Sequence, residues 1–306
     1  MVLSLQTVTV IMLTVIVLMP FHLYAQEIEP RTFANAPVGM NFIVSGFGYS
    51  EGGVMTDPSV PLKDAEIQIN GIPLAYARIL NFWGRSGKFD IILIHTFTSG
   101  SATVDGESRE RDVSGFADPK LRLSINLYGA PALSLKEFKD YQQDLIIGAS
   151  FQVSPPLGQY DSDKLLNIGT NRWSFKPEIG LSKAMGPLTL ELAASAVFFT
   201  DNDEFYGSTK YKQDPIYAGQ SNIIYRFKRG VWGSLGGTYY AGGRTTKNGM
   251  EGDELQETTR FGATFSFLIN KSHSIKLNAS TGVFTRTGSD FDSFGIVWQY
   301  RWAEGF

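Results

Sequence analysis

The sequence has 306 residues, 43% of them hydrophobic, and a formal net charge of -3 at pH 7. This charge gives no case for nucleic-acid binding, and the absence of cysteine excludes a disulfide framework and thiolate chemistry. A mean hydropathy of -0.07 is too polar for a bundle of membrane helices, but it fits a β-barrel in which only alternate residues meet lipid. The 32 glycines, 22 phenylalanines and 13 tyrosines also favour packed strands.

The first 25 residues carry no charge, and Val8 to Met19 form an apolar run. The run is shorter than the roughly 20 residues that a spanning helix needs. We interpret residues 1–25 as a signal peptide that is cut after Ala25. The expected domains are therefore this peptide, a periplasmic N-terminal segment over 26–37 and a barrel over 38–306. Because no Lys or Arg precedes the apolar run, a membrane anchor is the alternative interpretation.

Beyond residue 30 the sequence alternates between apolar and polar residues with a period of two, which predicts strands. Between 121 and 128, for example, Arg122, Ser124 and Asn126 separate leucine and isoleucine residues. We expect about twelve strands, the even number that a bacterial barrel with both termini in the periplasm requires. The pattern is strong over 121–128, 172–182, 188–198, 217–227, 260–267 and 275–286, and weaker over 39–50, 65–79, 88–98, 142–153, 230–242 and 292–302.

The expected connections alternate in length, as they do in outer-membrane barrels. The pattern predicts an all-β fold, an antiparallel transmembrane β-barrel with short periplasmic turns and long extracellular loops. One even-numbered connection, over 129–141, is longer and is expected to hold a short periplasmic helix. The long connections are 51–64, 99–117, 154–170, 200–212, 243–256 and 287–291, and the tight ones are 84–87, 185–187, 228–230 and 270–273.

The last predicted strand is rich in aromatic residues at alternate positions. Trp298, Tyr300 and Trp302 precede the terminal Phe306, although Glu304 interrupts the series. This pattern resembles the C-terminal signal by which the barrel-assembly machinery recognises outer-membrane barrels, and Trp and Tyr suit the membrane interface. The alternative is an ordinary edge strand. The signal implies integral insertion in the outer membrane of a Gram-negative cell, in contact with lipid and lipopolysaccharide.

Three stretches resemble a known family. They are the sequence Gly-Phe-Ala-Asp-Pro at 115–119, the stretch from Pro155 to Trp173 with its Asn-Ile-Gly-Thr-Asn-Arg-Trp segment, and Phe-Lys-Pro-Glu at 175–178. They are similar to the outer-membrane transporter family named for a meta-pathway of phenol degradation, over nearly the whole mature chain. The resemblance implies a porin-like barrel that passes hydrophobic or aromatic compounds.

The strand phases place many basic side chains in the lumen, so we expect a basic throat below acidic extracellular loops. Such a throat predicts a weakly anion-favouring pore, with aromatic carboxylates as candidate solutes. The alternative is that these charges pair across strands and fill a narrow barrel. The candidate permeation residues are Arg78, Arg122, Arg172, Lys176, Glu178, Glu191, Arg226, Arg260, Lys276, Arg286 and Arg301. The other charged residues that are expected to face the lumen are Lys88, Lys120, Arg244, Glu66, Asp90 and Asp144.

Enzymes and sealed barrels are the competing classes. A serine hydrolase needs a base, but His22 lies in the signal peptide, His273 in a periplasmic turn and His95 on a lipid-facing strand. A hydrolase that uses only aspartates in the outer loops is a weaker alternative. No metal-ligand spacing exists. We therefore expect no catalytic, cofactor-binding or metal-binding residues. A third class is a sealed structural or surface-interaction barrel, which the segment 26–37 or an inward loop could plug.

Overall fold

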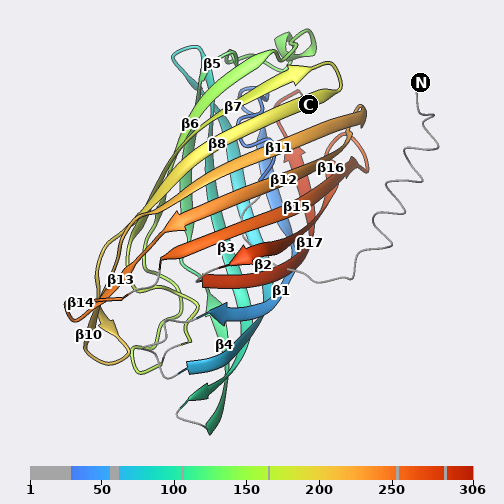
Figure 1. Cartoon of the computed structure of the whole chain (residues 1–306). Coiled ribbons are helices and arrows are strands. Elements are labelled where there is room, and N and C mark those ends of the chain that lie inside the picture. Colours follow the sequence, from blue (N-terminus) through green and yellow to red (C-terminus); the bar gives the residue numbers. More distant parts are fainter. Residues whose placement is uncertain are drawn as a thin grey trace.

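The computed structural model describes residues 29–55, 62–104, 107–164, 166–252, 255–285 and 288–305. Twelve antiparallel strands form one closed barrel, because the last strand pairs with the first, with Trp302 opposite Asn41 (Figure 1). The predicted fold class is confirmed. The wall strands are β1 (Asn41–Met55), β2 (Leu62–Phe82), β3 (Arg85–Val104), β5 (Lys120–Tyr128), β6 (Leu145–Ser154), β7 (Ser174–Met185), β8 (Leu188–Phe199), β11 (Ile216–Lys228), β12 (Val231–Gly242), β15 (Gln256–Leu268), β16 (His273–Thr285) and β17 (Gly288–Trp302).

The short turns gather at one end of the barrel, which is the periplasmic end in outer-membrane barrels. The turn between β2 and β3 has two residues, Trp83 and Gly84, with φ of 51° and 82°. Positive φ at both positions is the geometry of a type I′ hairpin, whose twist matches that of the strands. The longer connection after β5 holds a one-turn 3-10 helix, η1 (Glu137–Lys139), as predicted. Among the described residues no helix is long and apolar enough to span a bilayer.

The opposite end carries more strand than the sequence predicted. The expected loop over 99–117 is wrong, because β3 continues to Val104 and pairs with β4 (Glu107–Phe116) in a protruding hairpin (Figure 1). Predicted loops 200–212 and 243–256 likewise contain short strands. Their backbone groups pair in a second sheet with the order β14-β13-β10-β9. These strands are β9 (Asn202–Phe205), β10 (Thr209–Gln213), β13 (Thr245–Lys247) and β14 (Met250–Glu251).

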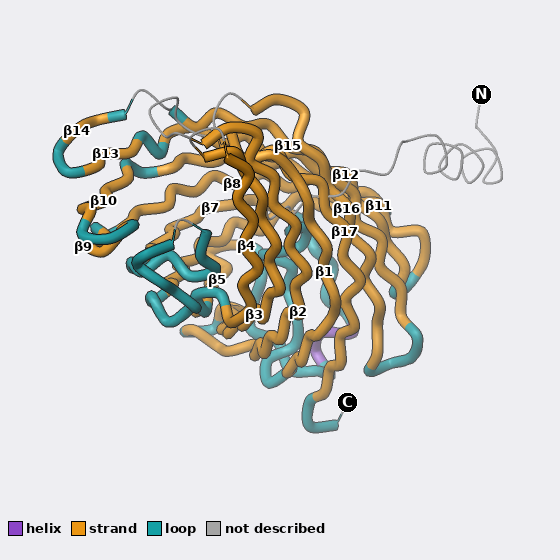
Figure 2. Tube along the Cα trace, turned by 90° about the horizontal axis from the view of Figure 1, so that it is seen from below, coloured by secondary structure: helices purple, strands orange, loops and turns teal. Residues whose placement is uncertain are grey.

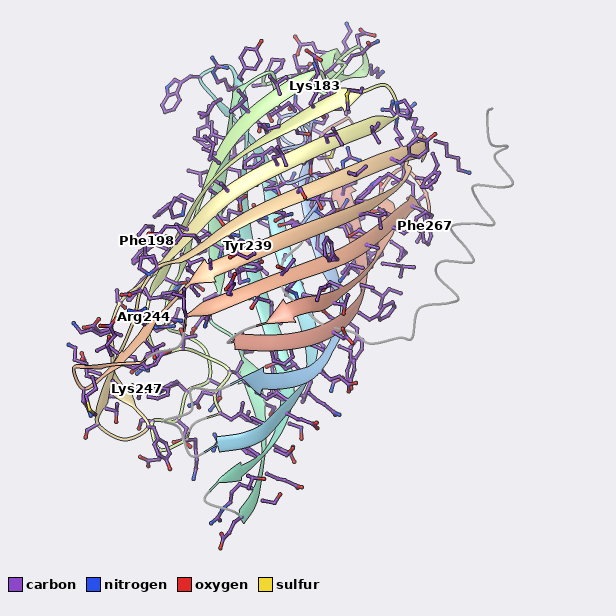
Figure 3. All side chains as sticks on the ribbon, viewed as in Figure 1. Lys183, Phe198, Tyr239, Arg244, Lys247 and Phe267 are labelled. Carbon is purple, nitrogen blue, oxygen red and sulfur yellow. The ribbon has the colours of Figure 1, made fainter. Side chains whose placement is uncertain are left out.

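The two faces of the wall differ in chemistry. Exposed apolar side chains face outward, among them Phe198 and Tyr239, while buried polar residues such as Ser150, Gln152 and Ser182 line the inside. Figure 3 places Lys183 at the periplasmic end and Arg244 at the extracellular end of this wall. Figure 2 views the ring of strands from the extracellular end and shows loop segments inside it. A lipid-facing outer surface around a polar interior is the arrangement of a transmembrane barrel.

The C-terminal aromatic residues form a stack on the outer surface near the periplasmic end. The ring centroids of Tyr300 and Trp302 are 5.3 Å apart, those of Trp298 and Tyr300 are 6.3 Å apart, and Tyr76 on β2 extends the row. Such a row suits the membrane interface. Phe306, the last residue of the predicted assembly signal, lies outside the described residues.

Candidate permeation site

Most of the candidate permeation residues lie on the inner face of the wall. Their strand partners are buried polar residues: Arg122 lies opposite Gln152, Lys176 opposite the same glutamine from the other side, and Glu191 opposite Ser182. Pairing places Glu178, Arg226, Arg260, Lys276 and Arg301 on the inner face too. Their role in permeation stays a prediction.

The lumenal assignment of Arg78 is wrong. Arg78 lies opposite Asn41, which in turn lies opposite Trp302 of the outer aromatic row, so all three share the outer face. Strand β2 is apolar on both faces in this region, and alternation therefore could not fix its phase. Arg286 lies outside the described residues.

Residues 29–40, which we call the lumenal segment, enter the barrel from the periplasmic end and contact its inner wall. They include the described part of the predicted periplasmic segment, whose boundaries stay a prediction. The segment forms no strand. Near the C-terminal end of the segment, the backbone N–H of Val38 donates to the carbonyl of Leu133. The backbone N–H of Gly39 donates to the carbonyl of Ile79.

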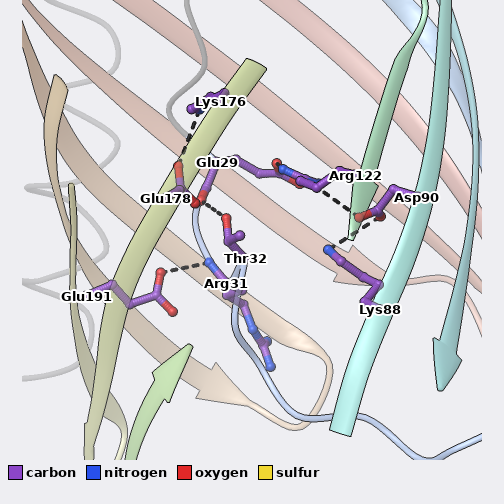
Figure 4. Close-up of polar contacts among 9 residues, drawn as sticks. All are labelled: Glu29, Arg31, Thr32, Lys88, Asp90, Arg122, Lys176, Glu178 and Glu191. Carbon is purple, nitrogen blue, oxygen red and sulfur yellow. Dashed lines mark hydrogen bonds and ion pairs between the residues drawn. The ribbon is translucent and has the colours of Figure 1, made fainter. Parts of the chain in front are cut away.

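The first wall contact of the segment is an ion pair between the buried Arg122 and the partly exposed Glu29. Arg122 Nη1 lies 2.8 Å from Glu29 Oε2, and Arg122 Nε lies 3.1 Å from Asp90 Oδ2 (Figure 4). Lys88 Nζ is 3.5 Å from the other oxygen of Asp90. Lys276 also faces the lumen, from β16, opposite Ser266. Arg122 therefore contacts two carboxylates, of which the wall supplies Asp90 and the lumenal segment supplies Glu29.

The second contact lies on a different part of the wall. The backbone N–H of Arg31 donates to Glu191 Oε2 at 2.8 Å, and Ser182 donates its hydroxyl to the other oxygen of that carboxylate (Figure 4). The guanidinium of Arg31 lies over the ring of Trp232 at 5.4 Å from the centroid. A cation over an aromatic face is worth roughly 0.5–2 kcal/mol, depending on its exposure. Strands β8 and β12 therefore hold the segment as β3 and β5 do.

The third contact is a notch in the inner wall that receives the ring of Phe33. Gly148 and Gly180 lie opposite each other on β6 and β7. A Cβ at Gly148 would lie 2.3 Å from Phe33 Cδ1, and one at Gly180 would lie 2.5 Å from Phe33 Cε2. Only glycine leaves room for the ring there. Phe33 also clusters with buried Ile146 and Ala130.

Little open space remains beside the segment. A cavity of about 20 Å³ is lined by Glu29, Phe33, Glu178, Glu191 and Asn222, among others. That is room for about one water molecule. The lumenal segment therefore packs closely against this part of the inner wall.

Arg172 lies at the other end of the lumen and has a different environment. Its guanidinium carbon is 4.1 Å from the ring centroid of Phe199 and 5.1 Å from that of Tyr211, and it donates to Gln213. The neighbouring loop is fastened by Asp118, which accepts bonds from the backbone N–H groups of Gly158 and Thr170. The motif residues that carried the family resemblance therefore order the extracellular mouth.

The remaining candidates show no catalytic arrangement. His95 lies outside the barrel between Phe97 and Phe116, and His273 accepts a bond from the indole of Trp298. Asp201 forms ion pairs with Lys210 and Lys212 in the small extracellular sheet. Within the described part of the chain, no group of three or more His, Asp or Glu residues could hold a metal ion.

Sequence reasoning identified the wall residues but missed Glu29, Arg31 and Phe33 as part of the same site. Their contacts span up to 160 positions along the chain, so no local pattern marks them. The available signal was the presence of oppositely charged residues in the short segment immediately before the first strand.

Comparison with known structures supports the fold. The chain resembles an outer membrane channel from Pseudomonas putida F1, with a TM-score of 0.72 and 21% identity over 90% of this chain and all of that one. It also resembles the transport unit of an autotransporter from Escherichia coli, with a TM-score of 0.53 and 9% identity over 90% and 93% of the two chains. No curated protein matches the chain significantly.

The family comparison covers more than half of the chain. Residues 54–300 match the family described as "Putative MetA-pathway of phenol degradation", which agrees with the resemblance seen in the sequence. The closed barrel, its apolar outer belt and its match to an outer membrane channel make the protein an integral outer-membrane barrel. The chain therefore belongs to the phenol-degradation family of outer-membrane β-barrels.

Proposed function

We propose that the protein is an outer-membrane channel for small hydrophobic or aromatic solutes, and that it has no enzymatic activity. One observation carries this proposal: the lumen holds a segment that belongs to no strand and is fastened by side-chain contacts and a few hydrogen bonds. An obstacle of this kind can move without breaking the β-ladder of the wall. The family name supports aromatic solutes, and the likeness to an outer membrane channel supports transport.

The proposed partners follow from the location in the membrane. The barrel meets lipid through its outer belt, and we expect lipopolysaccharide around the extracellular rim. The outward row of Trp298, Tyr300 and Trp302 supports recognition by the barrel-assembly machinery.

Transport is tested with the refolded mature chain in vesicles that carry lipopolysaccharide in the outer leaflet. Phenol uptake should exceed that of protein-free vesicles, while sucrose should stay excluded because the lumen is narrow. The control is Phe33→Cys/Gly148→Cys, in a chain that has no other cysteine, joined by a cleavable bis-maleimide. The crosslink should abolish phenol uptake, and its cleavage should restore it. Uptake no greater than that of protein-free vesicles, with or without the crosslink, would favour a sealed structural barrel.

A further inference from the structure

Glu29 occupies a pre-formed cation site in the wall. Asp90, itself a wall residue, lies 3.1 Å from Arg122 Nε, so one of the contacts that hold Arg122 does not come from the lumenal segment. Lys88 and Lys276 add positive charge from β3 and β16. A buried arginine that loses a carboxylate partner is strongly destabilised unless another anion replaces it.

The lumenal segment brings a carboxylate and a phenyl ring to one place. Glu29 and Phe33 both line the small cavity beside Glu191. The carboxylate of Glu29 bonds to Arg122, and the ring of Phe33 fills the notch at Gly148 and Gly180. These are the two groups of an aryl carboxylate, held by a cation site and an apolar notch.

We infer that Lys88, Arg122 and Lys276 form a binding site for the carboxylate of an aromatic acid in transit, and that Glu29 occupies this site as a tethered competitor. The inference rests on the proposed channel function and specifies its solute. Arginine suits the role because its planar fork binds carboxylates with two parallel hydrogen bonds. Entry of the solute carboxylate displaces Glu29, and return of the segment closes the lumen behind it.

A site of this kind differs from a diffuse basic throat. In a diffuse basic throat, removal of any one lumenal carboxylate would raise the positive potential, and with it anion binding, by a similar amount. In the inferred site, removal of Glu29 frees the donors of Arg122, whereas removal of Glu178, which lines the same cavity, frees only Lys176, with which it pairs at 3.3 Å. The matched pair Glu29→Gln and Glu178→Gln separates the two ideas.

The test is equilibrium binding of benzoate to the full-length mature barrel in detergent, by calorimetry, with benzyl alcohol as the uncharged comparison. Loss of the tethered competitor should tighten benzoate binding about tenfold in Glu29→Gln, because the effective concentration of a tethered group is high. Glu178→Gln should tighten it less than twofold. Benzyl alcohol binding should not distinguish the variants. Heat-modifiable migration checks that each variant is a folded barrel.

Two double variants identify the residues that donate hydrogen bonds to the benzoate carboxylate. Glu29→Gln/Arg122→Gln should lose the gain in benzoate affinity, and Glu29→Gln/Lys276→Gln should lose part of it. Equal tightening in Glu29→Gln and Glu178→Gln, or benzoate binding that survives the loss of Arg122, would overturn the inferred site. Because binding in detergent does not require transport, phenol uptake without benzoate binding would overturn this inference alone and leave the channel function standing.

Discussion

Arg122 and Arg260 are both buried on the inner wall, but their partners differ in origin. Arg260 is fully buried and donates to the hydroxyl of Ser280 on β16 and the carbonyl of Phe291 on β17. Arg122 is paired partly with Asp90 on the wall and partly with Glu29 on the lumenal segment. Two buried arginines therefore have different structural roles. One fastens strands to each other, and the other fastens a segment that must be able to leave.

The largest expected effect is on stability, and it falls on Arg260. Arg260→Met should lower the free energy of unfolding by about 3 kcal/mol, because the buried acceptors that it serves lose their donor. Arg122→Met should cost less, since the lumenal segment can withdraw and take Glu29 into water, and Lys88 remains 3.5 Å from Asp90. Urea unfolding in lipid vesicles, followed by tryptophan fluorescence, measures both. Equal losses would contradict the division between a wall arginine and a segment arginine.

The next largest effect is expected at the glycine notch, where the ring of Phe33 contacts the wall. Gly180→Ala should expel the Phe33 ring and raise the open probability in single-channel recordings about tenfold, since overpacking costs roughly 1–3 kcal/mol. Gly219→Ala is the matched control, because a Cβ at that strand glycine has open space around it.

A double-mutant cycle makes the test of the notch specific. Gly180→Ala added to Phe33→Ala should change the open probability little, since the ring that the new methyl group would displace is already gone. Additive effects would show that the alanine acts on the wall and not on the lumenal segment.

A smaller effect is expected at the second contact of the segment. Arg31→Gln keeps the backbone bond to Glu191 but removes the cation over Trp232. Open probability should rise two- to fivefold, as a loss of about 0.5–1 kcal/mol implies. Glu191→Leu removes the acceptor itself and should have the larger effect. If Arg31→Gln has the larger effect, the guanidinium and not the backbone holds the segment.

The sequence predicted the strands of the barrel wall better than it predicted the segment inside the barrel. Alternation placed Arg122 and Glu191 on the inner face because their strands have one apolar and one polar side. It failed at Arg78, since β2 is apolar on both faces where Ile79 packs in the interior. The partner of Arg122 could not be found, because Glu29 lies 93 positions away and no periodic pattern links them. The extracellular strands were missed since polar loop composition does not show that backbone groups pair.

The smallest effect on open probability is expected at the periplasmic rim, where Ser134 and Glu137 lie. Hydrogen bonds from the hydroxyl and backbone N–H of Ser134 lower the pKa of Glu137, and Leu133 beside them accepts the N–H of Val38 from the lumenal segment. Because this pKa is lowered, the ionised Glu137 stabilises the folded protein fully at pH values above its ordinary pKa of 4.5. This stabilisation is lost as the pH falls through the lowered pKa.

Ser134→Ala should raise the pKa of Glu137 toward that ordinary value, as carboxyl carbon NMR can measure. Because Glu137 is fully exposed and acts on the segment only through a neighbouring backbone bond, the open probability at neutral pH should change less than twofold. A larger change would mean that the rim, and not the buried contacts at Arg122, Glu191 and the glycine notch, holds the lumenal segment in the barrel.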